Sequence, residues 1–165
     1  MAVYTTHSAE ETRRLARSFA KKLGAVRQQR ALVVGLYGNL GSGKTTFTQG
    51  LIAAFGVKED VTSPTFVIEK IYKIKGKGFS HIIHIDAYRL RSADELKVLG
   101  WKEIEAESGN LIVVEWPEHV AELLSRGHLI LRFSFINHNE RIIEIDYGSP
   151  EKTKRKTKKE TAGAP

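Results

Sequence analysis

Residues 38–45 read Gly38-Asn39-Leu40-Gly41-Ser42-Gly43-Lys44-Thr45, which fits the phosphate-binding pattern Gly-x-x-x-x-Gly-Lys-Ser/Thr at every fixed position. An apolar run at 31–36 precedes this loop and a helix-like segment at 46–55 follows it, so the strand and helix that the motif requires are both present. Its three glycines allow consecutive backbone N–H groups to turn toward an anion. Lys44 can reach the outer phosphates, and the Thr45 hydroxyl can bind Mg²⁺. The chain is therefore predicted to bind a nucleoside triphosphate.

The rest of the chain alternates between helical and strand patterns. Ser8 opens a capping box for a helix predicted over 9–23, and Gly24 ends it. The β-rich runs 65–74 and 79–85 predict an antiparallel hairpin insertion. Further expected elements are a short helix from 93 to 99, a buried strand at 111–114, a short helix at 118–124, and paired strands at 128–136 and 141–147. This order predicts an α/β fold, a three-layer P-loop NTPase-type domain with a mixed sheet and the nucleotide at the carboxyl ends of its strands.

Composition and charge set the outer limits of the prediction. The chain has 165 residues, no cysteine and a net charge of +7. Residues 151–165 carry six Lys/Arg and two Asp/Glu without an apolar period, so we expect an ATPase domain over 1–150 and a basic, disordered tail over 151–165. No apolar stretch is long enough to span a bilayer, which indicates a cytoplasmic protein that does not enter the membrane. The six histidines are scattered and do not predict a zinc site.

Two carboxylates follow buried strands and are candidates for the chemistry. Glu115 ends the run Leu111-Ile112-Val113-Val114, and Asp86 ends Ile82-Ile83-His84-Ile85. A carboxylate at the end of a buried strand is a common partner of phosphate-bound Mg²⁺. We expect Glu115 to bind Mg²⁺ directly or through water. Asp86 is expected either to hold the metal-binding groups in place without binding the metal itself, or to position the attacking water.

Four blocks of sequence together resemble the TsaE family, also called YjeE. They are the phosphate loop at 38–46, Ser63-Pro64-Thr65-Phe66, His84-x-Asp86-x-Tyr88-Arg89-Leu90, and Val114-Glu115-Trp116-Pro117-Glu118, and the resemblance covers about residues 5 to 147. It implies an ATPase required for threonylcarbamoyladenosine, the modified base beside the anticodon of tRNA. The implied partners are the TsaD and TsaB proteins, with tRNA contacted indirectly through that complex.

The resemblance also implies roles for individual residues. It makes Gly41 to Thr46 the phosphate cradle, Thr45 and Glu115 the Mg²⁺ ligands, and Asp86 a residue needed for hydrolysis. The segments 62–66 and 115–118 would be switch-like. On the adenine side it implies an early threonine, Thr5 or Thr6, and a basic residue of the last hairpin, Arg141. The predicted site therefore has Lys44, Asp86 and Glu115 as catalytic residues, and a binding set of Thr6, Gly38, Gly41, Ser42, Gly43, Lys44, Thr45, Thr46 and Arg141, with ATP and Mg²⁺ as ligands.

Three other functions compete with this interpretation. A small-molecule kinase also needs a phosphate loop, and Asp86 with Arg89 offers a base and a phosphate-binding group, but the chain lacks an arginine-rich lid segment. A GTPase would need a guanine-reading Asn/Thr-Lys-x-Asp motif, and the nearest string, at 157–160, ends in Glu. The non-enzymatic alternative is a nucleotide-binding scaffold.

Overall fold

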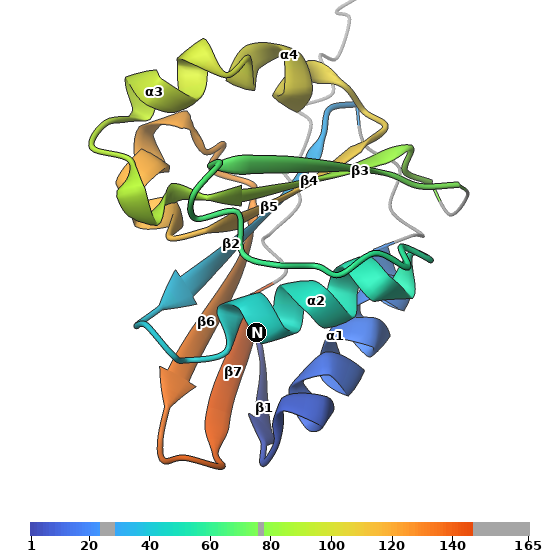
Figure 1. The fold of residues 1–165 in the computed structure, drawn as a ribbon, viewed down its shortest axis with the longest axis vertical. Helices are drawn as coiled ribbons and strands as arrows, with labels where there is room; N and C mark the ends of the chain where they lie inside the picture. Colours follow the sequence, from blue (N-terminus) through green and yellow to red (C-terminus); the bar gives the residue numbers. More distant parts are fainter. Residues whose placement is uncertain (24–28, 76–77, 147–165) are drawn as a thin grey trace, which may run out of the picture.

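A computed structural model of the chain describes residues 1–23, 29–75 and 78–146. Seven strands form one mixed sheet in the order β1-β7-β6-β2-β5-β4-β3 (Figure 1). The inner strands β6, β2, β5 and β4 run parallel, whereas β3, β7 and β1 each pair antiparallel with their neighbours. The strand bounds are β1 Ala2–Thr6, β2 Leu32–Gly38, β3 Glu69–Lys73, β4 His81–Asp86, β5 Asn110–Glu115, β6 Leu129–Phe135 and β7 Arg141–Asp146.

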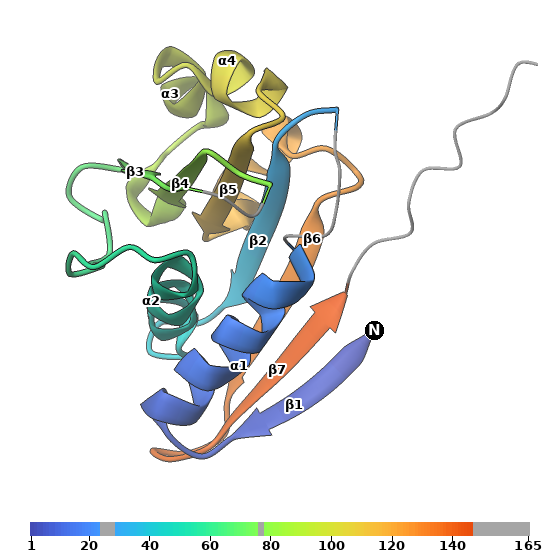
Figure 2. The same cartoon turned by 90° about the vertical axis from the view of Figure 1, so that its right-hand side faces the viewer.

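Helices cover both faces of the sheet and make the three layers (Figures 1 and 2). The helices α1, Ala9–Leu23, and α2, Lys44–Ala54, lie together on one face. The other face carries α3, Ala93–Val98, α4, Trp101–Ala106, and two 3₁₀ segments, η1, Ala87–Arg89, and η2, Pro117–Leu123. The side chains of Val34 and Val113 pack into the core on the α1 and α2 side, and those of Val33 and Ile112 pack on the opposite side. The predicted α/β fold with a mixed sheet is confirmed.

Local sequence signals explain where α1 begins. The Glu11 N–H donates to the Ser8 hydroxyl at 3.1 Å, and the Glu11 carboxylate accepts from the His7 N–H at 2.7 Å. The first bond satisfies a backbone donor that the first helical turn leaves unpaired, and the second pairs the N–H group of the residue before the N-cap. Buried residues recur along one stripe of the helix to Leu23, as the sequence pattern predicts.

The predicted hairpin is present as β3 and β4, with Tyr72 opposite Ile82. Its first strand is shorter than predicted, because the N–H groups of Val67 and Ile68 both donate to the Pro64 carbonyl and hold this part of the chain in a turn. The strand therefore begins at Glu69. The inner strand of the hairpin, β4, pairs parallel with β5, so the hairpin extends the central sheet.

Three elements, β1, α4 and the short 3₁₀ segment η1, were not predicted, and one was assigned to the wrong helix type. β1 pairs with β7, whose residues lie far along the chain, and no local pattern at 2–6 signals that partner. α4 follows α3 directly, because Gly100, at φ 86°, ends one helix and lets the next begin at the buried Trp101. The helix predicted at 118–124 is the 3₁₀ segment η2, in which Val120 has non-helical dihedrals. The predicted boundary near 150 and the tail 151–165 lie outside the described residues.

Gly50 sets the approach of α2 to α1, and its replacement provides a test of the packing. A Cβ atom at Gly50 would lie 2.6 Å from the Arg13 carbonyl oxygen and 2.7 Å from the Arg13 Cα atom. Gly50→Ala should lower the free energy of unfolding by about 1–2 kcal/mol. The new methyl group would press against the backbone of α1, and the cost of this overpacking outweighs the gain in helix propensity. Urea denaturation measures this change.

Gly127→Ala is the matched control, because a Cβ atom there meets no other heavy atom within 4 Å. The control should change the free energy of unfolding by less than about 0.5 kcal/mol. Equal stability of the two variants would contradict the close packing of the two helices.

Candidate functional site

The phosphate-type loop joins β2 to α2. Gly41, at φ 75°, and Gly43, at φ 102°, adopt left-handed backbone conformations that residues with a side chain rarely take. Gly38, at φ 142°, has a second reason to be glycine, because a Cβ atom there would lie 2.4 Å from the Phe133 carbonyl oxygen of the neighbouring strand. α2 begins at Lys44, so the unpaired N–H groups of its first turn and the positive end of its dipole lie at this loop. This arrangement of backbone groups is suited to binding an anion.

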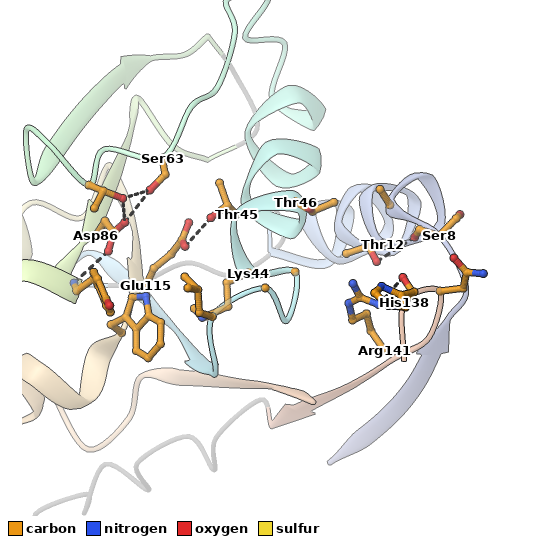
Figure 3. A pocket seen from close by; sticks show the side chains of 18 of the residues that line it. Ser8, Thr12, Lys44, Thr45, Thr46, Ser63, Asp86, Glu115, His138 and Arg141 are labelled. Carbon is orange, nitrogen blue, oxygen red and sulfur yellow. Dashed lines mark hydrogen bonds between the residues drawn. The ribbon is translucent and has the colours of Figure 1, made fainter. Parts of the chain in front are cut away.

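A cavity of about 590 Å³ opens over the loop (Figure 3). Its walls come from the loop and the start of α2, from the segment after α2, from the ends of β4 and β5, and from the start of α1 with the β6–β7 turn. The lining residues are His7, Ser8, Ala9, Thr12, Leu40, Gly41, Gly43, Lys44, Thr45, Thr46, Ser63, Thr65, Asp86, Tyr88, Glu115, Trp116, His138, Asn139 and Arg141. The sequence-predicted catalytic residues Lys44, Asp86 and Glu115 therefore share one cavity.

The Lys44 side chain is held within the loop itself. Its Nζ atom donates to the carbonyl oxygens of Gly38 at 2.6 Å and Asn39 at 2.9 Å, and it lies 3.9 Å from the centre of the Trp116 ring. Burial lowers the pKa of Lys44, and the nearby carboxylates of Glu115, Glu118 and Asp86 oppose that shift. This ammonium group is thus a partly desolvated cation at the cavity wall, where an anion would interact with it more strongly than in water.

Glu115 connects the loop helix to the sheet. Its Oε2 atom accepts from the Thr45 hydroxyl at 2.8 Å, and its Oε1 atom is bonded to His84 Nε2 at 2.9 Å. Glu115 is only 2% exposed. Strand register explains its place, since Glu115 lies opposite Leu36 of β2 on one side and opposite Asp86 of β4 on the other. The two carboxylates therefore end adjacent parallel strands at the same edge of the sheet.

Asp86 anchors the segment that follows α2. Its Oδ2 atom accepts from the Ser63 hydroxyl at 2.6 Å and also from the Thr65 hydroxyl, and its Oδ1 atom accepts from the Tyr88 N–H at 3.0 Å. The two hydroxyl oxygens lie 2.6 Å apart, so both are gathered at the same carboxylate oxygen. In this arrangement Asp86 holds the predicted switch segment 62–66 against the cavity.

Strained backbone conformations occur at one residue before Asp86 in the chain and at one residue after Glu115. Among the described residues, only Ile68, at φ 67°, and Trp116, at φ 58°, combine a side chain with a positive φ. Ile68 follows the segment bound to Asp86, and Trp116 follows Glu115 directly. Each such conformation costs of order 1–3 kcal/mol, and strain of this kind gathers at switch and ligand-binding segments. The Trp116 ring lies against the Tyr88 ring, with 5.0 Å between ring centres.

The residues present fit a Mg²⁺ ion held mainly by a nucleotide. In the parts of the chain that the structure describes, no group of three or more His, Cys, Asp or Glu side chains forms a cation cage. Mg²⁺ is commonly held by one or two protein oxygens together with phosphate oxygens and water. The Thr45 hydroxyl and the Glu115 carboxylate are a donor set of that kind, and they face each other across 2.8 Å.

At the end of the cavity away from the carboxylates, the lining includes the predicted Arg141 but not the predicted Thr6. Arg141 lines it, and its Nη1 atom donates to the carbonyl oxygens of Asn137 at 2.7 Å and His138 at 3.1 Å, which fixes the β6–β7 turn. Thr6 does not line the cavity, and its buried hydroxyl is hydrogen bonded at 2.9 Å to that of Thr12, which does. The predicted contact between Thr6 and the nucleotide stays a prediction, and Thr12 is the threonine of this pair that faces the cavity. Figure 3 shows Thr12, Ser8, His138 and Arg141 across the cavity from the carboxylates.

Two other residues of the predicted binding set, Gly38 and Ser42, do not line the cavity. The Gly38 carbonyl accepts from Lys44, and the Ser42 side chain is buried. Sequence reasoning did not place Ser8, Thr12, His138 and Asn139 at the cavity, because only the fold brings the start of α1 to the β6–β7 turn. It also assigned no role to His84, whose place in the block with Asp86 was the only available signal.

None of the described helices is long and apolar enough to cross a membrane.

Comparisons with known proteins agree with this geometry. The family model described as "Threonylcarbamoyl adenosine biosynthesis protein TsaE" matches residues 6–143. A tRNA threonylcarbamoyladenosine biosynthesis protein TsaE from Rickettsia typhi is 35% identical over 144 residues, covering 87% of this chain and 93% of the relative. The protein of the same name from Streptomyces coelicolor is 43% identical over 122 residues, 73% of this chain and 76% of the relative. The crystal structure of Bacillus subtilis YdiB superposes with a TM-score of 0.67 at 29% identity, covering 87% of this chain and 83% of that one.

Two substitutions separate the roles of the neighbouring loop residues. Lys44→Ala should weaken ATP binding by about 10–100-fold, because it removes a charge-assisted hydrogen bond to phosphate. Thr45→Ala should bind ATP in EDTA nearly as well as the parent but lose most Mg²⁺-dependent turnover, since it removes an oxygen suited to the metal. Isothermal titration and phosphate release measure the two effects.

Lys97→Ala is the lysine control, because Lys97 is exposed on α3 and its Nζ atom pairs with Asp94 at 2.7 Å, outside the cavity. It should keep the affinity of the parent. Parent-level ATP binding by Lys44→Ala would contradict the assignment of the loop.

Proposed function

The chain belongs to the TsaE family of threonylcarbamoyladenosine biosynthesis proteins, and on that premise we propose that it is a Mg²⁺-dependent ATPase that supports this modification of tRNA. The observation that carries the proposal is the meeting of a phosphate-binding loop with two buried carboxylates in one cavity. Lys44 and Thr45 belong to the loop, and Asp86 and Glu115 end the adjacent strands β4 and β5. Hydrolysis of the phosphoanhydride bond to the terminal phosphate needs these components: an anion cradle, a metal partner and a group that orients water.

The cavity has the size and polarity of a nucleotide site. Its volume of about 590 Å³ lies within the usual range for small-molecule pockets. The loop end would take the phosphates, where Gly41, Gly43 and the start of α2 present N–H groups. The end lined by Thr12 and Arg141, away from the carboxylates, would take the nucleoside. Adenine is the proposed base, on the strength of the family.

Thr45 and Glu115 are the proposed metal partners. When bound, Mg²⁺ neutralises charge on the phosphate oxygens and so favours attack at the terminal phosphorus. Glu115 contributes a buried carboxylate whose position is fixed from two sides, by Thr45 and His84. Lys44 would leave the loop carbonyls for the phosphates. Asp86, opposite Glu115 in the strand register, is proposed to orient the attacking water.

The internal hydrogen bonds of the site support slow hydrolysis by the chain alone. The hydroxyls of Ser63 and Thr65 both donate to Asp86. The Lys44 ammonium donates to loop carbonyls and lies over the Trp116 ring. These groups must exchange partners before they can hold a phosphate and a water molecule in line. A partner that stabilises the exchanged arrangement would raise turnover.

The proposed partners are the TsaD and TsaB proteins, with tRNA contacted indirectly through that complex. The proposed location is the cytoplasm, where tRNA is modified. The proposed catalytic domain is residues 1–150, and the basic residues 151–165 form a tail outside it. The apolar side chains Phe66 and Tyr88, exposed beside the cavity, support a protein partner near the switch segment.

The kinase alternative finds no specific support in the site. It requires Arg89 to face the transferred phosphate. The Arg89 guanidinium instead lies over the Phe66 ring, 4.4 Å from its centre, and does not line the cavity.

A turnover assay with the candidate partners tests the proposed function. The isolated chain should release phosphate from ATP slowly, and a TsaD–TsaB pair with tRNA should raise that rate by about tenfold or more, because it would order the switch segments. Lys44→Ala in the same mixture is the control for hydrolysis by the partners or contaminants. Transfer of the terminal phosphate to a small molecule, without a response to the partner pair, would support the kinase instead.

A further inference from the structure

We propose that His84 is a positioning residue that fixes the orientation of the Glu115 carboxylate and thereby sets the metal affinity of the site. The inference rests on the proposed function, because it assumes that Glu115 is a metal partner. It concerns a residue that lines no part of the cavity and is 0% exposed. His84 would therefore act through Glu115 and not on the nucleotide.

The sheet register brings the two side chains together. His84 of β4 lies opposite Val113 of β5, so Glu115 is its diagonal neighbour two residues farther along β5. Side chains two residues apart on a strand point to the same face, and diagonal neighbours are within reach of a long side chain. The His84 Nε2 atom lies 2.9 Å from Glu115 Oε1. The contact follows from strand pairing, so it does not depend on a loop conformation.

Each oxygen of the carboxylate has a different partner. His84 is bonded to Oε1 on the sheet side, and Thr45 is bonded to Oε2 at 2.8 Å on the α2 side. Thr45 is also a proposed metal partner, so its hydroxyl is expected to change partners when a nucleotide binds. The bond from His84 is then the one that continues to hold Glu115 in place.

The hydrogen-bond chemistry assigns the donor. An ionised carboxylate only accepts hydrogen bonds, so we place the proton of a neutral His84 ring on Nε2. The Nδ1 atom has no hydrogen-bond partner within the described residues. A buried polar atom without a partner costs free energy, so packing alone would favour an apolar side chain at this position. The Nε2–H donor is the property that an apolar residue would lack.

A fixed carboxylate has a direct consequence for the metal. Without the His84 donor, the Glu115 side chain could rotate, and ordering it on metal binding would cost conformational entropy. The buried carboxylate would also lose a hydrogen bond that stabilises its charge. Hydrogen-bond partners of metal ligands commonly change metal affinity by 10–100-fold. Removal of the His84 donor is therefore expected to weaken metal binding while leaving the phosphate cradle intact.

The test compares amide side chains of different reach. In His84→Gln the amide nitrogen lies at about the distance of Nε2 and can still donate to Glu115. In His84→Asn it lies at about the distance of Nδ1 and cannot. His84→Leu removes the donor altogether. Electron paramagnetic resonance measures Mn²⁺ affinity in the presence of a non-hydrolysable ATP analogue, and titration in EDTA measures the metal-free affinity for the analogue.

We expect His84→Asn and His84→Leu to weaken Mn²⁺ binding by about tenfold and His84→Gln to recover most of the loss. The metal-free affinity for the analogue should stay within about twofold of the parent in all three, because the cradle is unchanged. In a Glu115→Gln background, His84→Leu should cause little further loss, since its effect passes through Glu115.

Three results would overturn the inference. The first is parent-level Mn²⁺ affinity in a folded His84→Leu variant. The second is equal affinity in the glutamine and asparagine variants, which decides the question if the leucine variant does not fold. The third is a full loss from His84→Leu in the Glu115→Gln background. Glu115→Gln alone identifies a failure of the proposed function, because parent-level Mn²⁺ affinity in that variant would remove the metal role itself.

Discussion

The in-register parallel pairing of β2, β5 and β4 is the constraint on which the site depends. It sets Leu36 opposite Glu115, and Glu115 opposite Asp86, at the edge where β2 runs into the phosphate loop. A shift of one residue in either strand pair would turn these carboxylates to the opposite face of the sheet, away from α2. The hydrophobic runs at 32–36 and 111–114 are buried on both faces, and a slip that moved Glu115 would place its charge in the apolar core on the opposite face. The same strand register therefore determines both the packing of the core and the positions of the two carboxylates.

The charged groups of Lys44, Asp86 and Glu115 are each hydrogen bonded within the site, whereas Ser42 Oγ and His84 Nδ1 have no hydrogen-bond partner among the described residues. Lys44 is bonded to the loop, Thr45 and His84 to Glu115, and Ser63 to Asp86. Such a network stabilises buried charges, which would otherwise be costly. It also means that substrate must compete with internal partners. Strained backbone at Ile68 and Trp116, on either side of the network, is suited to a change between two arrangements.

Local chemistry explains which features the sequence predicts. The phosphate loop, the capping box at Ser8 and the carboxylates that end apolar strands are short-range patterns, and the structure brings Lys44, Glu115 and Asp86 into one cavity as expected. The pairing of β1 with β7 and the meeting of Thr12 with Arg141 depend on contacts between distant segments, so no local pattern contains them. That Thr12 lines the cavity and Thr6 does not depends on the same contacts. The hydrogen bond from His84 to Glu115 needs the strand register as well as the sequence.

ATP turnover by Asp86→Asn, Glu115→Gln and the double variant, in the presence of the partner proteins, is the most direct test that the two carboxylates serve one chemical step. Each single substitution should lower the rate by about 100-fold or more, because each removes a group that acts on the same phosphate and water. If the residues act as a unit, the double variant will be little slower than the slower single variant. Losses that multiply in full would show that Asp86 and Glu115 act independently, and would contradict a single site built by the pairing of β4 and β5.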